Sequence, residues 1–144
     1  MKVIILILFG FTLISCNDNE TTISSEVDEH CNSALQEINE TLKIFEVRET
    51  HDISTIMLVK MRMIHSSPLD RTATFCIRCR DIELDKKADF IETYLLLSSE
   101  LDNIFFGIDD YDYPLTANEA EEIKEFIIQM QKIMEEINNL PLLK

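Results

Sequence analysis

Apolar residues recur at steps of three and four along most of this chain, which is the period of one face of an α-helix. The first such stripe comprises Val27, Cys31, Ala34, Leu35, Ile38, Leu42 and Phe45. A second, near the C-terminus, comprises Ile123, Phe126, Ile127, Met130, Ile133, Met134 and Ile137. No segment alternates with the period of a strand for long enough to matter. The pattern therefore predicts an all-α protein.

Capping residues and polar interruptions divide the chain into helices. Ser25 can cap the first helix, and the polar run 48–52 predicts a break near residue 50. Ser67 and Pro68 suit the cap and first turn of a new helix, so we expect a tight helical hairpin at residues 65–68. Thr116 and Glu119 have the spacing of a capping box, which predicts the start of the last helix.

The stretch after Pro68 has no strong helix breaker until Gly107. Within it, a stripe of apolar residues is predicted to face the core: Leu84, Ala88, Ile91, Leu95, Leu101 and Phe105. A further break near residue 83 would let the chain fold back. We therefore expect an antiparallel helical bundle of four helices, with three long helices as the fallback. The three-helix version would expose apolar surface around Met57 and Phe75.

The first sixteen residues follow a different pattern. Lys2 precedes a mostly apolar run, Val3 to Leu13, which is too short to span a bilayer as a helix. The run closes with Leu13-Ile14-Ser15-Cys16. This segment resembles the lipobox of bacterial prolipoproteins, in which an aliphatic residue, a tolerant residue and a small residue precede an invariant cysteine. An ordinary secretory signal is the alternative, although Leu13 is bulky for the position three residues before cleavage.

The resemblance implies that residues 1–15 are a signal peptide and that a lipid is attached to the Cys16 sulfur. Residues 16–24 would then be the lipidated cysteine and a flexible tether, and residues 25–144 the helical bundle domain. It also implies a lipid-anchored protein of the bacterial cell envelope, on the periplasmic side or at the cell surface. The membrane is then a partner through the covalent lipid, and no other cofactor is expected.

Charge narrows the range of partners. The chain has 27 acidic and 13 basic residues, a formal net charge of −14. Such a surface disfavours nucleic acid, which needs basic residues, and is compatible with a basic protein partner or with simple solvation. Glu119 and Glu122 on the last helix are candidate partner-binding residues. Tyr111 and Tyr113 in the preceding loop are further candidates, because tyrosine is enriched in binding hot spots.

Cysteine usage leaves several interpretations open. Besides Cys16, the chain has Cys31 and the pair Cys76 and Cys79, which form a CxxC inside a predicted helix. A thioredoxin-like motif would follow a strand, and none is predicted. Burial as small apolar residues or a structural disulfide is more plausible. Helix pairing about residue 67 would place Cys31 near residue 103, which disfavours a disulfide from Cys31.

The same pairing would bring Cys76 close to Met57. Met61 lies one turn further along the same helix face. Thiolate and thioether ligands select Cu(I), so Met57, Met61, Cys76 and Cys79 are candidate ligands for a soft metal. Packing of both methionines in the core is the alternative.

No histidine pairs with a serine or cysteine in a way that suggests nucleophilic catalysis, so the sequence points to no enzyme. It predicts a small acidic lipid-anchored protein-binding module, either of the immunity or exclusion type or an accessory subunit of an envelope complex. The alternative function is copper binding at the hairpin of residues 57–79. The pattern leaves self-association open.

Overall fold

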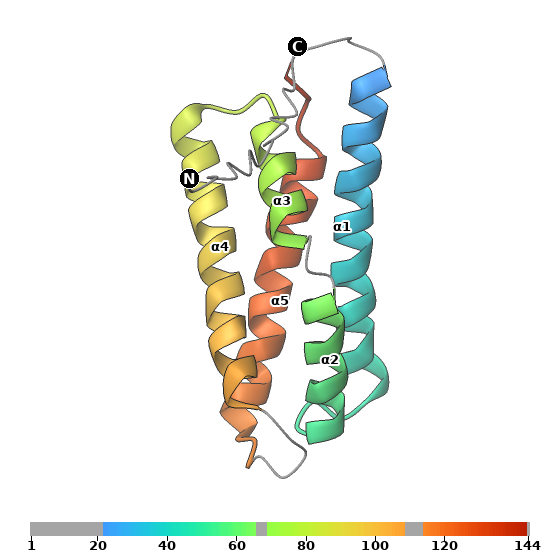
Figure 1. The fold of residues 1–144 in the computed structure, drawn as a ribbon, viewed down its shortest axis with the longest axis vertical. Coiled ribbons are helices and arrows are strands. Elements are labelled where there is room, and N and C mark those ends of the chain that lie inside the picture. The colour runs from blue at the N-terminus through green and yellow to red at the C-terminus, as the bar shows by residue number, and fades with distance from the viewer. Residues whose placement is uncertain (1–21, 66–68, 109–113, 144) are drawn as a thin grey trace, which may run out of the picture.

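The computed structural model describes residues 22–65, 69–108 and 114–143, and these residues form five α-helices (Figure 1). The helices are α1 (Thr22–Val47), α2 (Ile53–His65), α3 (Leu69–Arg78), α4 (Leu84–Gly107) and α5 (Ala117–Asn138). Within the described ranges the only β-type pairing is an isolated antiparallel bridge between Arg80 and Leu142. The expectation of an all-α protein is confirmed, but the described residues form five helices where four were expected.

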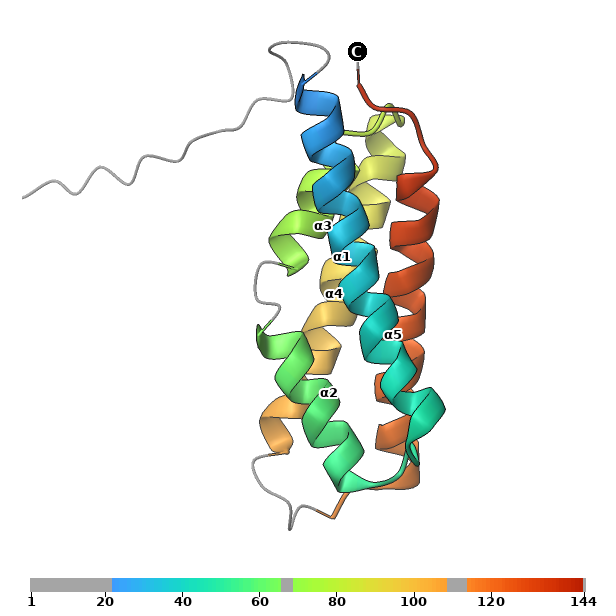
Figure 2. The same ribbon diagram turned by 90° about the vertical axis from the view of Figure 1, so that its right-hand side faces the viewer.

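The direction of the chain explains the additional helix. From α1 the chain reverses into α2, and α3 then continues in the same general direction as α2 (Figures 1 and 2). Only after α3 does it reverse again into α4, which runs antiparallel to α5. The predicted hairpin at residues 65–68 is therefore wrong. Ser67 and Pro68, the predicted cap and first turn, lie outside the described residues, and a capping signal does not specify the direction in which a helix runs.

The break predicted near residue 50 is confirmed, and the chain also breaks near residue 83, which the sequence left open. α1 ends at Val47 and α2 begins at Ile53, while α3 ends at Arg78 and α4 begins at Leu84. Just before α2, Asp52 Oδ1 accepts a hydrogen bond from the Ser54 N–H at 3.0 Å, and Asp52 Oδ2 accepts one from Ser54 Oγ at 2.6 Å. These bonds lower the pKa of the Asp52 carboxyl.

The core is formed mainly by the first and the last helix of the chain, α1 and α5, together with α3 and α4. α5 packs against α1 and α4, and α3 packs against α1, α4 and α5, whereas α2 packs chiefly against α1. The stripes predicted for α1 and α5 face this core. The fully buried large side chains include Ile38, Ile77, Tyr94, Leu101, Phe105, Ile123, Ile127, Met130, Met134 and Ile137.

Of the three predicted helix starts, the two that lie in the described residues have different outcomes. The capping box at α5 is confirmed, because Thr116 Oγ1 accepts from the Glu119 N–H at 3.2 Å and the Thr116 N–H donates to Glu119 Oε2 at 2.9 Å. α1, in contrast, begins at Thr22, so Ser25 lies inside the helix and is not its cap. None of the helices in the described ranges combines the length and the apolar character that crossing a membrane requires.

Candidate protein-binding surface

Helix α4 carries apolar side chains on two of its faces. The face turned to the core presents Tyr94, Leu97, Leu101 and Phe105, all of which are buried. Leu95, which the sequence placed on the core side, is 43% exposed. The predicted stripe is thus correct for Leu101 and Phe105 and wrong for the exposed residues Leu84, Ala88 and Leu95. Burying an aromatic ring removes more apolar area from water than burying a leucine, so Tyr94 takes the inward position.

Three of the exposed apolar residues of α4 lie along one line of the helix. Leu84, Leu95 and Phe106 follow each other at intervals of eleven residues. Eleven residues make about three helical turns, so these side chains leave the helix in nearly the same direction over about 33 Å. Leu84 is 82% exposed and Phe106 is 84% exposed. We call this row of three residues the α4 line.

Acidic residues surround the α4 line. The exposed acids of this helix are Asp85, Asp89, Glu92, Glu100 and Asp102. Its two bases are Lys86 and Lys87, and the Lys87 ammonium donates a hydrogen bond to the Arg78 carbonyl at 3.1 Å. The surface of α4 therefore combines a row of large apolar groups with a surplus of negative charge.

A polar cluster lies where α3 meets α4. The Ser98 hydroxyl donates to Asp70 Oδ2 at 2.7 Å. Partial burial, and secondarily the charge of Asp70, raise the pKa of the Asp102 carboxyl. The Tyr94 hydroxyl is buried without a hydrogen-bond partner in the described part of the chain, and burial with the nearby Asp70 charge raises its pKa. Negative charge is thus concentrated beside the α4 line.

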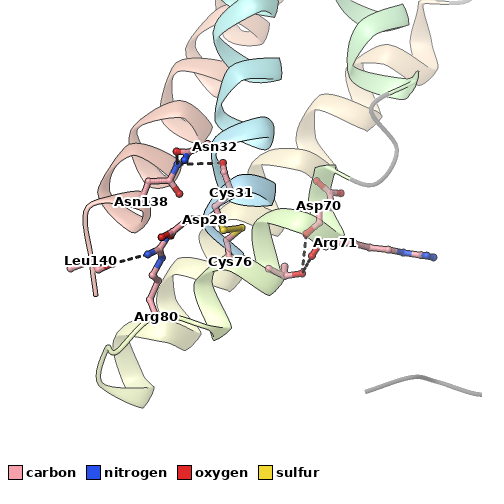
Figure 3. Close-up of a disulfide and its surroundings, with 10 residues drawn as sticks. Asp28, Cys31, Asn32, Asp70, Arg71, Cys76, Arg80, Asn138 and Leu140 are labelled. Atoms are coloured by element: carbon pink, nitrogen blue, oxygen red, sulfur yellow. Dashed lines mark hydrogen bonds and ion pairs between the residues drawn. A yellow bond between two sulfur atoms is a disulfide. The ribbon is translucent and has the colours of Figure 1, made fainter. Parts of the chain in front are cut away.

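The end of the molecule where α1 and α4 begin is held by a disulfide (Figure 1). Cys31 on α1 and Cys76 on α3 are joined and fully buried (Figure 3). The expectation that helix geometry disfavours this link is wrong, because the chain reverses near residue 50 and not at residue 67. That reversal places Cys31 opposite the α3 segment. Cys79, which follows α3, is also disulfide-bonded.

Arg80 holds the same end through polar contacts. Its side chain is 3% exposed, donates to Asp28 Oδ1 at 2.9 Å and donates to the Leu140 carbonyl at 2.8 Å (Figure 3). The backbone of the C-terminal segment pairs with the same turn, since the Asp81 N–H donates to the Pro141 carbonyl at 2.8 Å. The turn between α3 and α4 is therefore tied to both α1 and the C-terminal segment.

The structure does not bring the four candidate ligands for a soft metal together. Cys76 and Cys79 are oxidised and so present no thiolate. Met57 packs partly buried against the core, whereas Met61 is 52% exposed. Because α3 continues in the direction of α2, position 76 lies further along the molecule than position 57. Among the described residues, no group of three or more histidine, cysteine, aspartate or glutamate side chains is placed to hold a metal ion.

Of the residues that the sequence suggested for partner binding and lipidation, only Glu119 and Glu122 lie in the described part of the chain. The Glu119 carboxylate takes part in the α5 capping box, so it serves the helix start. Glu122 is exposed on α5. Tyr111, Tyr113 and Cys16 lie outside the described residues.

Comparisons with known proteins assign the chain to no family. The chain matches no protein-family model, and it has no significant match among curated proteins or solved structures. The sequence does not indicate the α4 line, because Leu84 and Leu95 also belong to the stripe at steps of three and four that was predicted to face the core.

Proposed function

We propose that this protein is a lipid-anchored protein of the bacterial cell envelope that works by binding another protein through the α4 line. The observation that carries the proposal is the exposure of Leu84, Leu95 and Phe106 in one row. Apolar residues scattered singly on a surface are ordinary. These three lie about 16 Å apart but leave α4 in nearly the same direction, and this alignment supports a contact surface. Such a surface suits an immunity-type protein and an accessory subunit of a complex equally.

The location rests on different support. The leader ending in Cys16 has the order of a lipobox, and disulfides such as Cys31–Cys76 persist in oxidising compartments outside the cytosol. We also propose that α2 and α3 serve as one interrupted column, so that the five helices make a four-column antiparallel bundle. In that arrangement α4 is an outer column and its exposed face is available to a partner.

Affinity capture with chemical cross-linking in native membranes tests the binding surface. The variant Leu95→Glu/Phe106→Glu places charge on the α4 line, and Val47→Glu is a matched control because Val47 is 81% exposed on α1. Capture of the partner should fall by at least about tenfold in the first variant, as expected when a buried contact worth 1.4 kcal/mol is lost. Equal capture by all three proteins would contradict the proposed surface.

Metabolic labelling with a fatty-acid analogue tests the anchor. The wild-type protein should take up the label, and Cys16→Ser should not. The chain has four cysteines, of which Cys31 and Cys76 are joined to each other and Cys79 is also disulfide-bonded. Because one sulfur cannot hold both a lipid and a disulfide, lipidation of Cys16 requires that Cys79 is linked to a cysteine of another chain. A mass spectrum in which Cys79 is linked to Cys16 would contradict lipidation.

A further inference from the structure

We propose that the partner of the α4 line is a second copy of this chain, packed so that the two α4 helices run antiparallel with Leu95 on the two-fold axis. This inference rests on the proposed function, since it names the partner of that same surface. Closed symmetric dimers are the most common oligomers of soluble proteins, and their interfaces must be self-complementary.

The spacing of the α4 line meets this requirement. Leu84 and Phe106 each lie eleven residues from Leu95, on opposite sides. At about 1.5 Å per residue, both lie about 16 Å from the proposed axis. An antiparallel pair therefore places Leu95 against Leu95 of the second copy. It also places each Leu84 against Phe106 of the other copy, so all exposed residues of the line are covered.

The charges of α4 are compatible with this register. Pairing about Leu95 brings Asp102 opposite Ala88, and it brings Glu92 opposite Ser98. The remaining acids of α4 also fall opposite uncharged residues: Asp85, Asp89 and Glu100. No carboxylate of one α4 therefore directly faces a carboxylate of the other, which would be destabilising.

The same register offers a partner for an uncompensated charge. Asp102 forms no ion pair with any residue in the described ranges. In the proposed dimer, Lys87 of the second copy comes opposite residue 103, next to Asp102, and leaves the helix about 80° from Leu95. The small side chain of Ala88 opposite Asp102 lets the two helices approach at this point. Attachment of both copies to one membrane would raise their effective concentration.

Cysteine cross-linking of the full lipidated chain in native membranes tests the register. Leu95→Cys places a thiol on the axis, so it should form a covalent dimer on a non-reducing gel. Leu96→Cys is the matched control: Leu96 is 59% exposed but leaves the helix about 100° away from Leu95. Leu84→Cys should cross-link with a co-expressed Phe106→Cys chain, and it should not cross-link with itself. The wild-type chain reports any dimer formed through its own cysteines.

The outcomes separate the two proposals. If Leu95→Cys stays monomeric, or if Leu96→Cys cross-links equally well, the second copy is not the partner and the inference is overturned. If in that case Leu95→Glu/Phe106→Glu still loses capture of a different protein, the proposed function stands without the dimer. If capture is unaffected as well, both proposals fail.

Discussion

Arg80 is a single side chain that joins segments far apart in the sequence. It reaches Asp28, 52 residues earlier, and the carbonyl of Leu140, 60 residues later. Nothing in the sequence indicates this contact, because an arginine after a helix end is usually exposed. Its burial becomes apparent only once α1, the α3–α4 turn and the C-terminal segment are assembled.

We expect Arg80→Ala to lower the free energy of unfolding by about 2–3 kcal/mol, because hydrogen bonds to a charged group are lost and a carbonyl is left unpaired. Urea unfolding followed by circular dichroism would measure the change. The matched control is Arg78→Ala, an exposed arginine two positions earlier, which should shift stability by less than about 0.5 kcal/mol. Equal effects of the two substitutions on the free energy of unfolding would show that the contacts of Arg80 do not stabilise the fold.

Asp102 makes stability depend on pH. Partial burial, with the Asp70 charge second, raises its pKa above the usual value of 3.8. The native protein therefore holds this proton more tightly than the unfolded chain, and stability is lost as pH rises from that value through the native pKa. Asp102→Asn should stabilise the fold near pH 7 by at most about 0.5 kcal/mol, because this largely exposed charge is screened by water.

Urea midpoints of the wild type and Asp102→Asn near pH 7 and near pH 3 check this expectation. The difference should vanish at the lower pH, where the aspartate is protonated in both states. Asp89→Asn removes an exposed acid from the same helix and controls for the change in net charge. A gain from Asp102→Asn that is the same at both pH values would exclude the titration of Asp102 as its cause.

At the scale of elements, the disulfide fixes α3 against α1. Cys31 and Cys76 are separated by 45 residues. Closing a loop of this length stabilises the folded state by about 4 kcal/mol in the chain-entropy model. We expect the double variant Cys31→Ala/Cys76→Ala to lose much of this in urea unfolding. A loss below about 1 kcal/mol would mean that packing of α3 already holds the two helices together.

The buried face of a helix was predictable from the sequence where the helix has one apolar stripe, but not where it has two. α1 and α5 each present one buried stripe, so the period of the sequence identified their core faces. α4 has apolar residues on two faces, so the period of the sequence did not identify which face is buried. Where α3 lies depends on the direction of the chain after residue 65, which local signals do not encode. That direction also decided which helix lies opposite Cys31.

At the scale of the whole molecule, the net charge of −14 opposes self-association. Two copies of the chain repel each other, and salt screens this repulsion over about 10 Å at 0.1 M. Raising the salt concentration should therefore increase the yield of the Leu95→Cys covalent dimer. A basic partner would show the opposite trend, because salt weakens attraction between unlike charges. A yield of this dimer that falls with added salt would show that the attraction between Lys87 of one copy and Asp102 of the other outweighs the repulsion between the net charges.

The Cys31–Cys76 disulfide also limits how far the domain can be unravelled by tension applied through its N-terminal segment. α1 begins at Thr22, and Cys31 follows nine residues later. Nine residues extend by at most about 32 Å before the load reaches the covalent bond. Pulling would thus peel away about two and a half turns of α1 and then stop. Unfolding under force would stop at the disulfide before it reaches α4. Drag on a tethered molecule would therefore leave the exposed apolar side chains of the α4 line undistorted.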